Sequence, residues 1–245
     1  MATVLKRPGG ELAQRPLHFF WIVDCSGSMH GDKIGTVNNA IQSTIPEMVA
    51  AAEGNPNAQL YVRTLKFESD ARWITEGAVP IENFAWNDLT ASGGTSLGQA
   101  FDLLASELTI PPMSERALPP VLVLLSDGMP TDDYQTTLSK LLNLPWGKKS
   151  VRIAISIGND ADDSVLAEFT GCPELVLQAN NPQTLVKMIR WASTAASQVS
   201  APASRPAVSR PKNPLDEAFE APPSPPAPLV LDMNNIPAVN DSDVW

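Results

Sequence analysis

Residues 17–29 have the sequence LHFFWIVDCSGSM, and this stretch decides the fold. Residues 17–24 form a short, almost continuous apolar run that ends in an acid, Asp24. Such a run is typical of a strand that is buried on both faces of a parallel sheet. Because ligands bind at the carboxyl edge of an open parallel sheet, the acidic and serine-rich residues after the strand are candidate binding residues.

Outward from this strand, apolar strands alternate with amphipathic helices. Apolar side chains three and four residues apart predict a helix over 33–52, which Asp32 caps and Pro46 kinks or breaks early. The further expected elements are strands 59–67 and 72–79 as an antiparallel pair, helix 97–108, strand 121–125, helix 134–142, strand 151–157, helix 163–169, strand 175–177 and helix 181–199. The pair Asn181-Pro182 is a favourable start for the last helix. The alternation predicts an α/β fold, with a doubly wound, mostly parallel sheet flanked by helices, over residues 17–199.

The two ends of the chain differ from this domain in composition. Residues 1–16 carry prolines and glycines that disfavour regular structure and predict a flexible arm. Residues 200–245 are rich in proline, alanine and serine, which predicts a disordered acidic tail. The tail ends in Val244 and Trp245. We interpret these two residues as a docking peptide for a partner protein, with incidental composition as the alternative.

The composition excludes several classes of protein. The formal net charge is −10 and the pI is about 4.6. This argues against general binding to nucleic acid or to anionic membranes, since both need clustered Lys and Arg. The sequence shows neither a signal peptide nor an apolar run long enough for a membrane helix. Cys25 and Cys172 lack zinc or haem spacing and are expected to be reduced thiols, so we predict a cytoplasmic protein.

Three segments near the carboxyl ends of predicted strands carry oxygen donors. They are residues 24–28, 92–96 and 125–128. Their donor side chains are carboxylates and hydroxyls, and the set needs neither a histidine nor a thiolate. Such oxygen ligands favour Mg²⁺, Ca²⁺ or Mn²⁺ over zinc or copper. The sequence therefore predicts a Mg²⁺ site, with Ca²⁺ or Mn²⁺ as alternatives.

Together the three segments resemble the metal-ion-dependent adhesion site of von Willebrand factor A (VWA) domains, which have a Rossmann-like fold. The family pattern is Asp-x-Ser-x-Ser on a first loop, Thr on a second and Asp on a third. The matching residues are Asp24, Ser26, Ser28, Thr95 and Asp127. The resemblance implies that the hydroxyls of this set contact the ion and that the carboxylates commonly act through water. It also implies one open coordination position, which a carboxylate of a partner protein can fill.

Within the family, the strings DCSGSM (24–29), HGDKI (30–34) and ISIGNDAD (155–162) are similar to bacterial TerY-type proteins. Those proteins are associated with tellurite resistance and with stress or phage-defence gene clusters. A Ser/Thr kinase and a metal-dependent protein phosphatase often accompany them. The resemblance therefore implies a non-enzymatic scaffold or adaptor, with the kinase and the phosphatase as expected partners.

Two other functions stay open at this point. One is a partner subunit of an AAA+ ATPase, which would use the same metal site, and the other is a metal-dependent hydrolase. Against an enzyme, the chain has no Gly-x-Ser-x-Gly elbow, and neither His18 nor His30 has a sequence context typical of a general base. Asp132 and Asp133 follow the third segment. We interpret them as helix caps, with added negative potential near the ion as the alternative.

Overall fold

A computed structural model describes residues 14–55, 58–127, 129–158, 161–179, 181, 183–184 and 186–187. The strands are β1 (Arg15–Asp24), β2 (Ala58–Phe67), β3 (Ala71–Trp73), β4 (Val79–Pro80), β5 (Val121–Ser126), β6 (Val151–Ile157) and β7 (Val176–Ala179). The helices are α1 (Asp32–Glu53), α2 (Leu97–Glu107), α3 (Tyr134–Asn143), α4 (Pro145–Lys149) and α5 (Asp163–Thr170), with 3-10 turns η1 (Gly27–Met29), η2 (Ile81–Asn83) and η3 (Pro173–Leu175).

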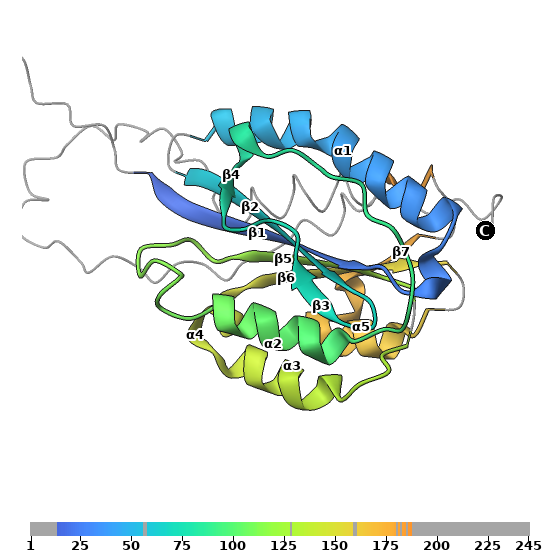
Figure 1. The fold of residues 1–245 in the computed structure, drawn as a ribbon. Helices are drawn as coiled ribbons and strands as arrows, with labels where there is room; N and C mark the ends of the chain where they lie inside the picture. Colours follow the sequence, from blue (N-terminus) through green and yellow to red (C-terminus); the bar gives the residue numbers. More distant parts are fainter. Residues whose placement is uncertain are drawn as a thin grey trace, which may run out of the picture.

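All the described strands belong to one mostly parallel sheet (Figure 1). Its order is β3-β2-β1-β5-β6-β7, and β4 also pairs with β2. Strands β2, β1, β5, β6 and β7 are parallel, whereas β3 and β4 run antiparallel to β2. This confirms the doubly wound α/β fold. The chain leaves β1 for β2 on one side and later returns to β5 on the other, so the carboxyl ends of β1 and β5 form the switch point where such sheets bind ligands.

Helices cover both faces of the sheet (Figure 1). Alternate residues of β1 enter different cores, with Phe19 and Trp21 on the α1 side and Phe20 and Ile22 on the side of α2, α3 and α5. All four are fully buried. The unbroken apolar run of β1 is therefore explained by a strand that has no solvent-facing side. Each such side chain stabilises the fold by roughly 1.5–3 kcal/mol relative to exposure.

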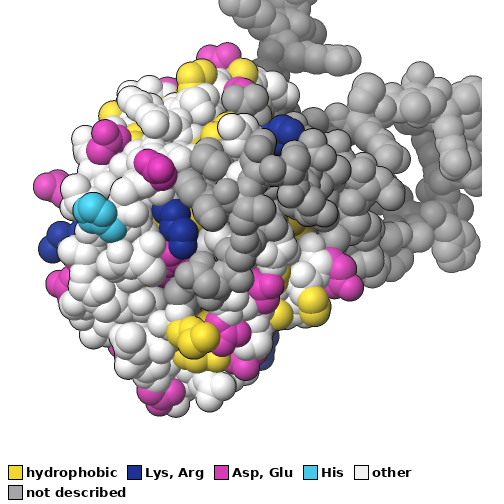
Figure 2. Space-filling model, turned by 90° about the vertical axis from the view of Figure 1, so that its right-hand side faces the viewer, with side chains coloured by type: hydrophobic (Ala, Val, Ile, Leu, Met, Phe, Trp, Pro, Cys, Tyr) yellow, Lys and Arg dark blue, Asp and Glu magenta, His cyan; other side chains and the backbone are white. Residues whose placement is uncertain are grey.

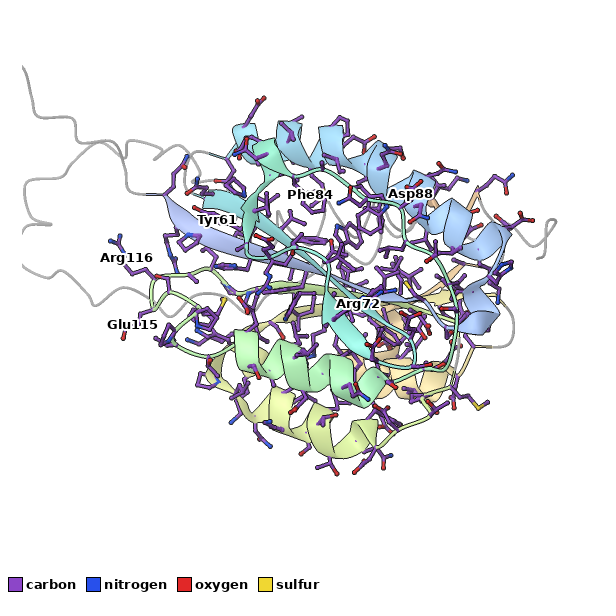
Figure 3. All side chains as sticks on the ribbon, viewed as in Figure 1. Tyr61, Arg72, Phe84, Asp88, Glu115 and Arg116 are labelled. Atoms are coloured by element: carbon purple, nitrogen blue, oxygen red, sulfur yellow. The ribbon has the colours of Figure 1, made fainter. Side chains whose placement is uncertain are left out.

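Side chains fill the layer between the sheet and α1, where Phe84 belongs to the α1-side core (Figure 3). Glu115 and Arg116 extend outward from the loop that precedes β5, at the end of the sheet opposite the carboxyl edge (Figure 3). The amino edge of the sheet is thus closed by a loop, and Arg15 fastens that loop through bonds from its guanidinium to the carbonyls of Arg116 and Ala117. These contacts also explain why β1 begins at Arg15, inside the expected flexible arm.

Several expected boundaries are wrong, each for a local reason. Asp32 does not cap α1, because Gly31 with φ of 82° is the cap and Asp32 lies in the first turn. Pro46 does not end the helix, which continues to Glu53. The side chain of Thr44 donates to the carbonyl of Ala40 over 2.7 Å in the turn before Pro46.

The strand expected over 72–79 is two short strands, β3 and β4, which both pair with β2. Between them Ile74 still bonds to Thr64 through its backbone, but the chain then bends before β4. The sequence also did not predict α4, a five-residue helix that starts at Pro145. At the expected start of the last helix, Asn181 accepts a hydrogen bond from the backbone of Thr184 over 2.8 Å, which confirms Asn181 as a cap.

The arm over residues 1–13, most of the last helix and the tail over 200–245 lie outside the described residues, together with Val244 and Trp245. In the part of the chain that is described, no helix has the length and apolar character needed to cross a membrane.

Candidate metal centre

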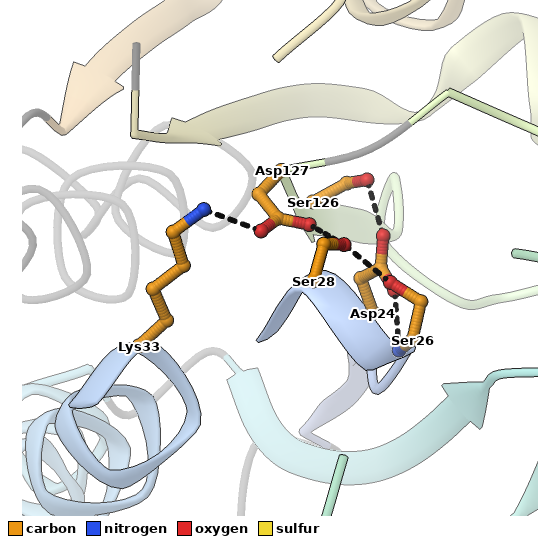
Figure 4. Close-up of polar contacts among 6 residues, drawn as sticks. All are labelled: Asp24, Ser26, Ser28, Lys33, Ser126 and Asp127. Atoms are coloured by element: carbon orange, nitrogen blue, oxygen red, sulfur yellow. Dashed lines mark hydrogen bonds and ion pairs between the residues drawn. The ribbon is translucent and has the colours of Figure 1, made fainter. Parts of the chain in front are cut away.

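Four of the five expected metal-site residues meet at the switch point between β1 and β5 (Figure 4). Asp24 is the last residue of β1, and Asp127 directly follows β5. Ser26 and Ser28 lie in and next to the 3-10 turn η1, which folds the chain back over the end of β1. Parallel pairing of β1 with β5 places Val23 opposite Leu125. This register brings Asp24 and Asp127 to one edge of the sheet although they lie far apart in the sequence.

A chain of hydrogen bonds joins the hydroxyls to Asp127. Oγ of Ser28 donates to Oδ1 of Asp127 over 2.7 Å. Oγ of Ser26 lies 3.0 Å from Oγ of Ser28. Because a hydroxyl has one proton and Ser28 gives its own to the carboxylate, Ser26 is the donor in this second bond. Both hydroxyls therefore keep oxygen lone pairs that are not used by these bonds.

Asp24 is held by two donors from its own neighbourhood. The backbone N–H of Ser26 donates to Oδ1 over 2.8 Å, and Oγ of Ser126 donates to Oδ2 over 2.6 Å. The residue is fully buried. Burial raises the pKa of the Asp24 carboxyl above its ordinary value, the hydrogen bonds from Ser126 and Ser26 oppose this rise, and the nearby charge of Asp127 adds to it. A cation bound close to Asp24 would favour its ionised form.

The side chain of Lys33 also reaches the site, and the sequence did not predict this contact. Nζ of Lys33 lies 2.6 Å from Oδ2 of Asp127 and forms an ion pair with it (Figure 4). Lys33 is the second residue of α1, so the direction of this helix decides whether its side chain reaches the site. No short motif carries that information. Ser126 was missed as a site residue as well, although it stands beside Asp127 in the sequence.

The fifth expected residue, Thr95, comes from a loop that is fastened to the turn around Ser26. The backbone of Gly27 donates to the carbonyl of Gly93 over 3.0 Å, and that of Ser92 donates to the carbonyl of Cys25 over 2.7 Å. Thr95 itself is buried. Its backbone pairs with Thr131, whose N–H donates to the Thr95 carbonyl over 2.9 Å. The loop with Thr95 is therefore bonded directly to the loop with Ser26 and to the segment after Asp127.

The loop after β2, which contains Glu68 and Ser69, is hydrogen-bonded to the Thr95 loop. Oγ of Ser69 accepts from the backbone of Gly94, and Oε2 of Glu68 accepts from Oγ of Ser92. Gly93 has a φ of 77°, and a Cβ there would lie 2.3 Å from Oγ of Ser69. A side chain at this position is thus excluded both by the backbone conformation and by the neighbouring loop. This support was not foreseen, because no spacing in the sequence links residues 68–69 to 92–94.

The two acids after the third segment are helix caps, as expected. Asp133 caps α3 through a bond from the backbone of Thr136. Asp132 caps a different helix, since its carboxylate accepts from the backbones of Gly98 and Gln99 at the start of α2. Asp132 therefore fixes the start of the helix that follows the Thr95 loop.

The donor set is suited to an ion that prefers oxygen. Within the described residues, no group of three or more His, Cys, Asp or Glu side chains gathers, so a thiolate or histidine type of metal centre is not present there. The assembled set has two carboxylates and several hydroxyls, which fits Mg²⁺, Ca²⁺ or Mn²⁺. Cys25 lies beside the set, but burial raises the pKa of its thiol to about 12, so it stays protonated near neutral pH.

Acidic side chains are scattered over the face at the carboxyl edge of the sheet, with a smaller basic area among them (Figure 2). Met129, two residues after Asp127, is 65% exposed, and His30 after the turn is exposed too. The rim of the site thus carries an exposed apolar side chain, Met129, among acidic and basic groups.

Comparisons with known proteins agree with this architecture. A family model described as the von Willebrand factor type A domain matches residues 20–191. A search among curated proteins finds no match. Among solved structures, a von Willebrand factor type A protein from Catenulispora acidiphila is similar with a TM-score of 0.53 and 15% identity, covering 75% of this chain and 43% of that one.

Two further solved structures with a similar fold come from an adhesin and a matrix protein. The pilus adhesin SpaC from Lactobacillus rhamnosus GG matches with a TM-score of 0.61 and 14% identity, covering 77% of this chain and 31% of that one. The proximal thread matrix protein 1 from the mussel byssus, in a structure with a zinc-occupied metal-ion-dependent adhesion site, matches with a TM-score of 0.53 and 16% identity, covering 76% and 47%. The chain spans less than half the length of each of these proteins. At such identities the likeness shows the fold alone.

Proposed function

Because the chain belongs to the von Willebrand factor type A domain family, whose members are generally metal-dependent interaction modules, we propose that it binds a partner protein through a divalent metal ion at this site. The proposed ion-holding residues are Asp24, Ser26, Ser28, Thr95 and Asp127. The observation that carries the proposal is the assembly of the first loop and the third segment into one buried, hydrogen-bonded oxygen cluster.

The contacts of the carboxylates support an ion held mainly by neutral oxygens. Both oxygens of Asp24 accept from protein donors, and so do both oxygens of Asp127. The hydroxyls of Ser26 and Ser28 also keep oxygen lone pairs for the ion, and the donors bound to the two carboxylates offset part of the negative charge that these present to it. When bound, such an ion keeps much of its positive charge and supplies an open position for a carboxylate of the partner.

We propose Mg²⁺ as the ion, with Ca²⁺ or Mn²⁺ as alternatives, since all three accept oxygen ligands. The mussel byssus protein holds zinc in its site, so zinc belongs in any comparison of ions. A carboxylate is the proposed contact on the partner, and Met129 adds an apolar contact beside it. Nucleic acids and anionic membranes play no part in this proposal, because they are negatively charged and the chain is acidic.

For the biological setting, we propose a bacterial cytoplasmic scaffold of the TerY type, in a stress-response, tellurite-resistance or phage-defence system. Its partners would be a Ser/Thr kinase and a metal-dependent protein phosphatase. The motifs DCSGSM and ISIGNDAD support this assignment. The tail residues Val244 and Trp245 are proposed as a second docking element, which would raise the apparent affinity through a high effective concentration.

We propose binding and not catalysis for this centre. His18, one of the two histidines, is stacked between Phe20 and Tyr61 within the sheet, and burial lowers the pKa of its imidazole. The Ser28 hydroxyl is held by Asp127, whose other oxygen is already paired with Lys33. A carboxylate that is already paired with a lysine is a weaker base for the Ser28 hydroxyl, so the arrangement is better suited to holding an ion than to activating a serine.

Calorimetric titration of the full chain with Mg²⁺, Mn²⁺, Ca²⁺ and Zn²⁺ tests the proposal. We expect binding of at least one oxygen-preferring ion, and a loss of affinity of about tenfold or more in Ser28→Ala and in Thr95→Ala. Ser106→Ala removes a hydroxyl from the exposed surface of α2 and should bind like the wild type. A wild-type chain that takes up none of the four ions would refute the metal site.

The partner is tested by capture on the immobilised full chain. We expect a bacterial lysate to yield proteins retained in Mg²⁺ and released by EDTA, and the same proteins should be missing from Ser28→Ala. Proteins retained equally by Ser28→Ala do not bind through the ion. If all retained proteins behave in this way, the metal-dependent binding function is wrong even where the ion binds.

A further inference from the structure

The ion pair of Lys33 with Asp127 is built into the centre of the site. The Asp127 side chain is fully buried, and that of Lys33 is 16% exposed. Lys33 lies in the first turn of α1. A positive charge is electrostatically unfavourable at the start of a helix, where the backbone N–H groups already make the potential positive. The ion pair with Asp127 offsets this unfavourable position.

The ammonium also limits what Asp127 can do. Oδ1 of Asp127 accepts from Ser28 and Oδ2 from Lys33. An ion that approached Oδ2 would meet the positive charge of the ammonium, which lies 2.6 Å from that oxygen. Lys33 therefore disfavours direct contact between Asp127 and a bound cation.

The net charge of the site follows from these groups. Two carboxylates and one ammonium give the empty cluster one negative charge, which attracts a cation. A divalent ion changes this to one positive charge, which attracts a carboxylate. Without Lys33 the loaded cluster would be neutral. The lysine therefore determines whether the site has a net positive charge after the ion has bound.

We propose that Lys33 sets the charge of this site: it weakens binding of the ion and strengthens binding of the anionic partner group to the loaded site. This rests on the proposed function of the site as a metal centre. The lysine is a specificity-determining residue outside the five-residue motif. Its two effects have opposite signs, which separates an electrostatic role from a structural one.

The decisive variant is Lys33→Met, which keeps most of the aliphatic side chain and removes the charge. We expect the affinity of the full chain for Mn²⁺ to rise roughly tenfold, because a unit charge near a divalent ion changes a binding constant by about that factor even in a well-solvated site. We expect acetate to bind the Mn²⁺-loaded variant roughly tenfold more weakly than the loaded wild type. Calorimetry measures the first quantity, and the loss of Mn²⁺-bound water on acetate addition, followed by water proton relaxation, measures the second.

Three further variants complete the experiment. Lys33→Gln also removes the charge but can still donate to Asp127, so it should shift both affinities in the same directions as Lys33→Met with less risk to folding. Lys33→Arg keeps the charge and should stay within about twofold of the wild type in both measurements. Lys140→Met removes an exposed lysine paired with Asp102, on the α3 surface, and should change neither.

The outcomes separate the inference from the function on which it rests. A wild type that binds no Mn²⁺ overturns the metal site itself. A wild type that binds Mn²⁺, with neutral variants that lose affinity for both Mn²⁺ and acetate, shows a lysine needed for structure and overturns the inference alone. Unchanged affinities in both neutral variants overturn it too. Tighter Mn²⁺ binding together with weaker acetate binding supports it.

Discussion

Oγ of Ser126 donates a hydrogen bond to Oδ2 of Asp24 over 2.6 Å, and this bond joins the last residue of β5 to the last residue of β1. The two strands are neighbours in the sheet, but the whole of α1, β2 and α2 lies between them in the chain. The side-chain bond thus acts at the topological switch point, just beyond Val23 and Leu125, the last backbone pair between β1 and β5. Asp24 depends on it, because burial disfavours its charged form.

We therefore expect Ser126→Ala to weaken both the fold and the ion site. A hydrogen bond to a buried charged group contributes about 1.5–3 kcal/mol, so the free energy of unfolding without metal should fall by about 2 kcal/mol. The pKa of Asp24 should rise further, since a bond that favours its ionised form is lost. Urea unfolding in EDTA measures the loss of stability, and Mg²⁺ calorimetry measures the loss of affinity at the ion site. Ser106→Ala is the control, and equal unfolding curves for the two variants would contradict the role of Ser126.

A second prediction concerns the glycine of the Thr95 loop. Gly93→Ala forces a Cβ toward Ser69 at a residue with positive φ, whereas Gly35 in α1 has open space around its Cβ position. We expect Gly93→Ala to lower the free energy of unfolding by about 1–3 kcal/mol and to weaken Mg²⁺ binding. Gly35→Ala should stabilise the helix by roughly 0.5–1 kcal/mol and leave the ion site unchanged. The pair is measured by urea unfolding and calorimetry, and a Gly93→Ala variant that binds Mg²⁺ like the wild type would show that the loop does not position Thr95.

A third prediction uses the two thiols. Cys25 is fully buried, and burial raises its pKa to about 12. Cys172 is only partly buried, and the hydrogen bond to Glu174 together with some desolvation raises its pKa. Since the thiolate is the reactive form and grows as pH approaches the pKa from below, Cys172 should be alkylated faster between about pH 7 and 9 while Cys25 stays intact. Mass spectrometry of iodoacetamide-treated native chain measures this, and denaturant should expose both. Rapid native modification of Cys25 would indicate that the loop with Ser26 opens.

Much of the fold follows from the sequence because the strands are buried on both sides. In β1, residues that point to opposite faces are all apolar, and that pattern distinguishes a central parallel strand from an edge strand. The split of 72–79 into β3 and β4 could not be predicted in the same way. Both strands lie at the edge beside β2, where side chains are half exposed and the pattern is weak.

Some residues of the candidate site could likewise be predicted from the sequence, and others could not. Asp24, Ser26 and Ser28 are close in sequence, so a local motif can identify them, and Asp127 follows from the end of the neighbouring strand. Lys33 could not be identified, because its reach depends on the direction in which α1 leaves the turn. Glu68 and Ser69 were missed since their role consists of contacts with another loop. Sequence motifs therefore find residues that contact the ligand better than residues that position them.

The last prediction concerns Asn38, a buried residue of α1 that fixes the start of the loop toward Thr95. Its Nδ2 donates to the carbonyl of Leu89 over 2.9 Å, and its Oδ1 accepts from Leu89 N–H and from Nε1 of Trp86 over 2.9 and 3.1 Å. Asn38→Ala leaves these groups unpaired away from water, and each unsatisfied buried group costs about 1–3 kcal/mol. We expect a loss of about 2–4 kcal/mol in the free energy of unfolding.

Asn39 is the matched control because it is the next residue of the same helix and is exposed. Asn39→Ala should change stability by less than about 0.5 kcal/mol. Urea unfolding of both variants without metal decides the matter, since equal losses would mean that helix propensity and not the buried amide accounts for the effect.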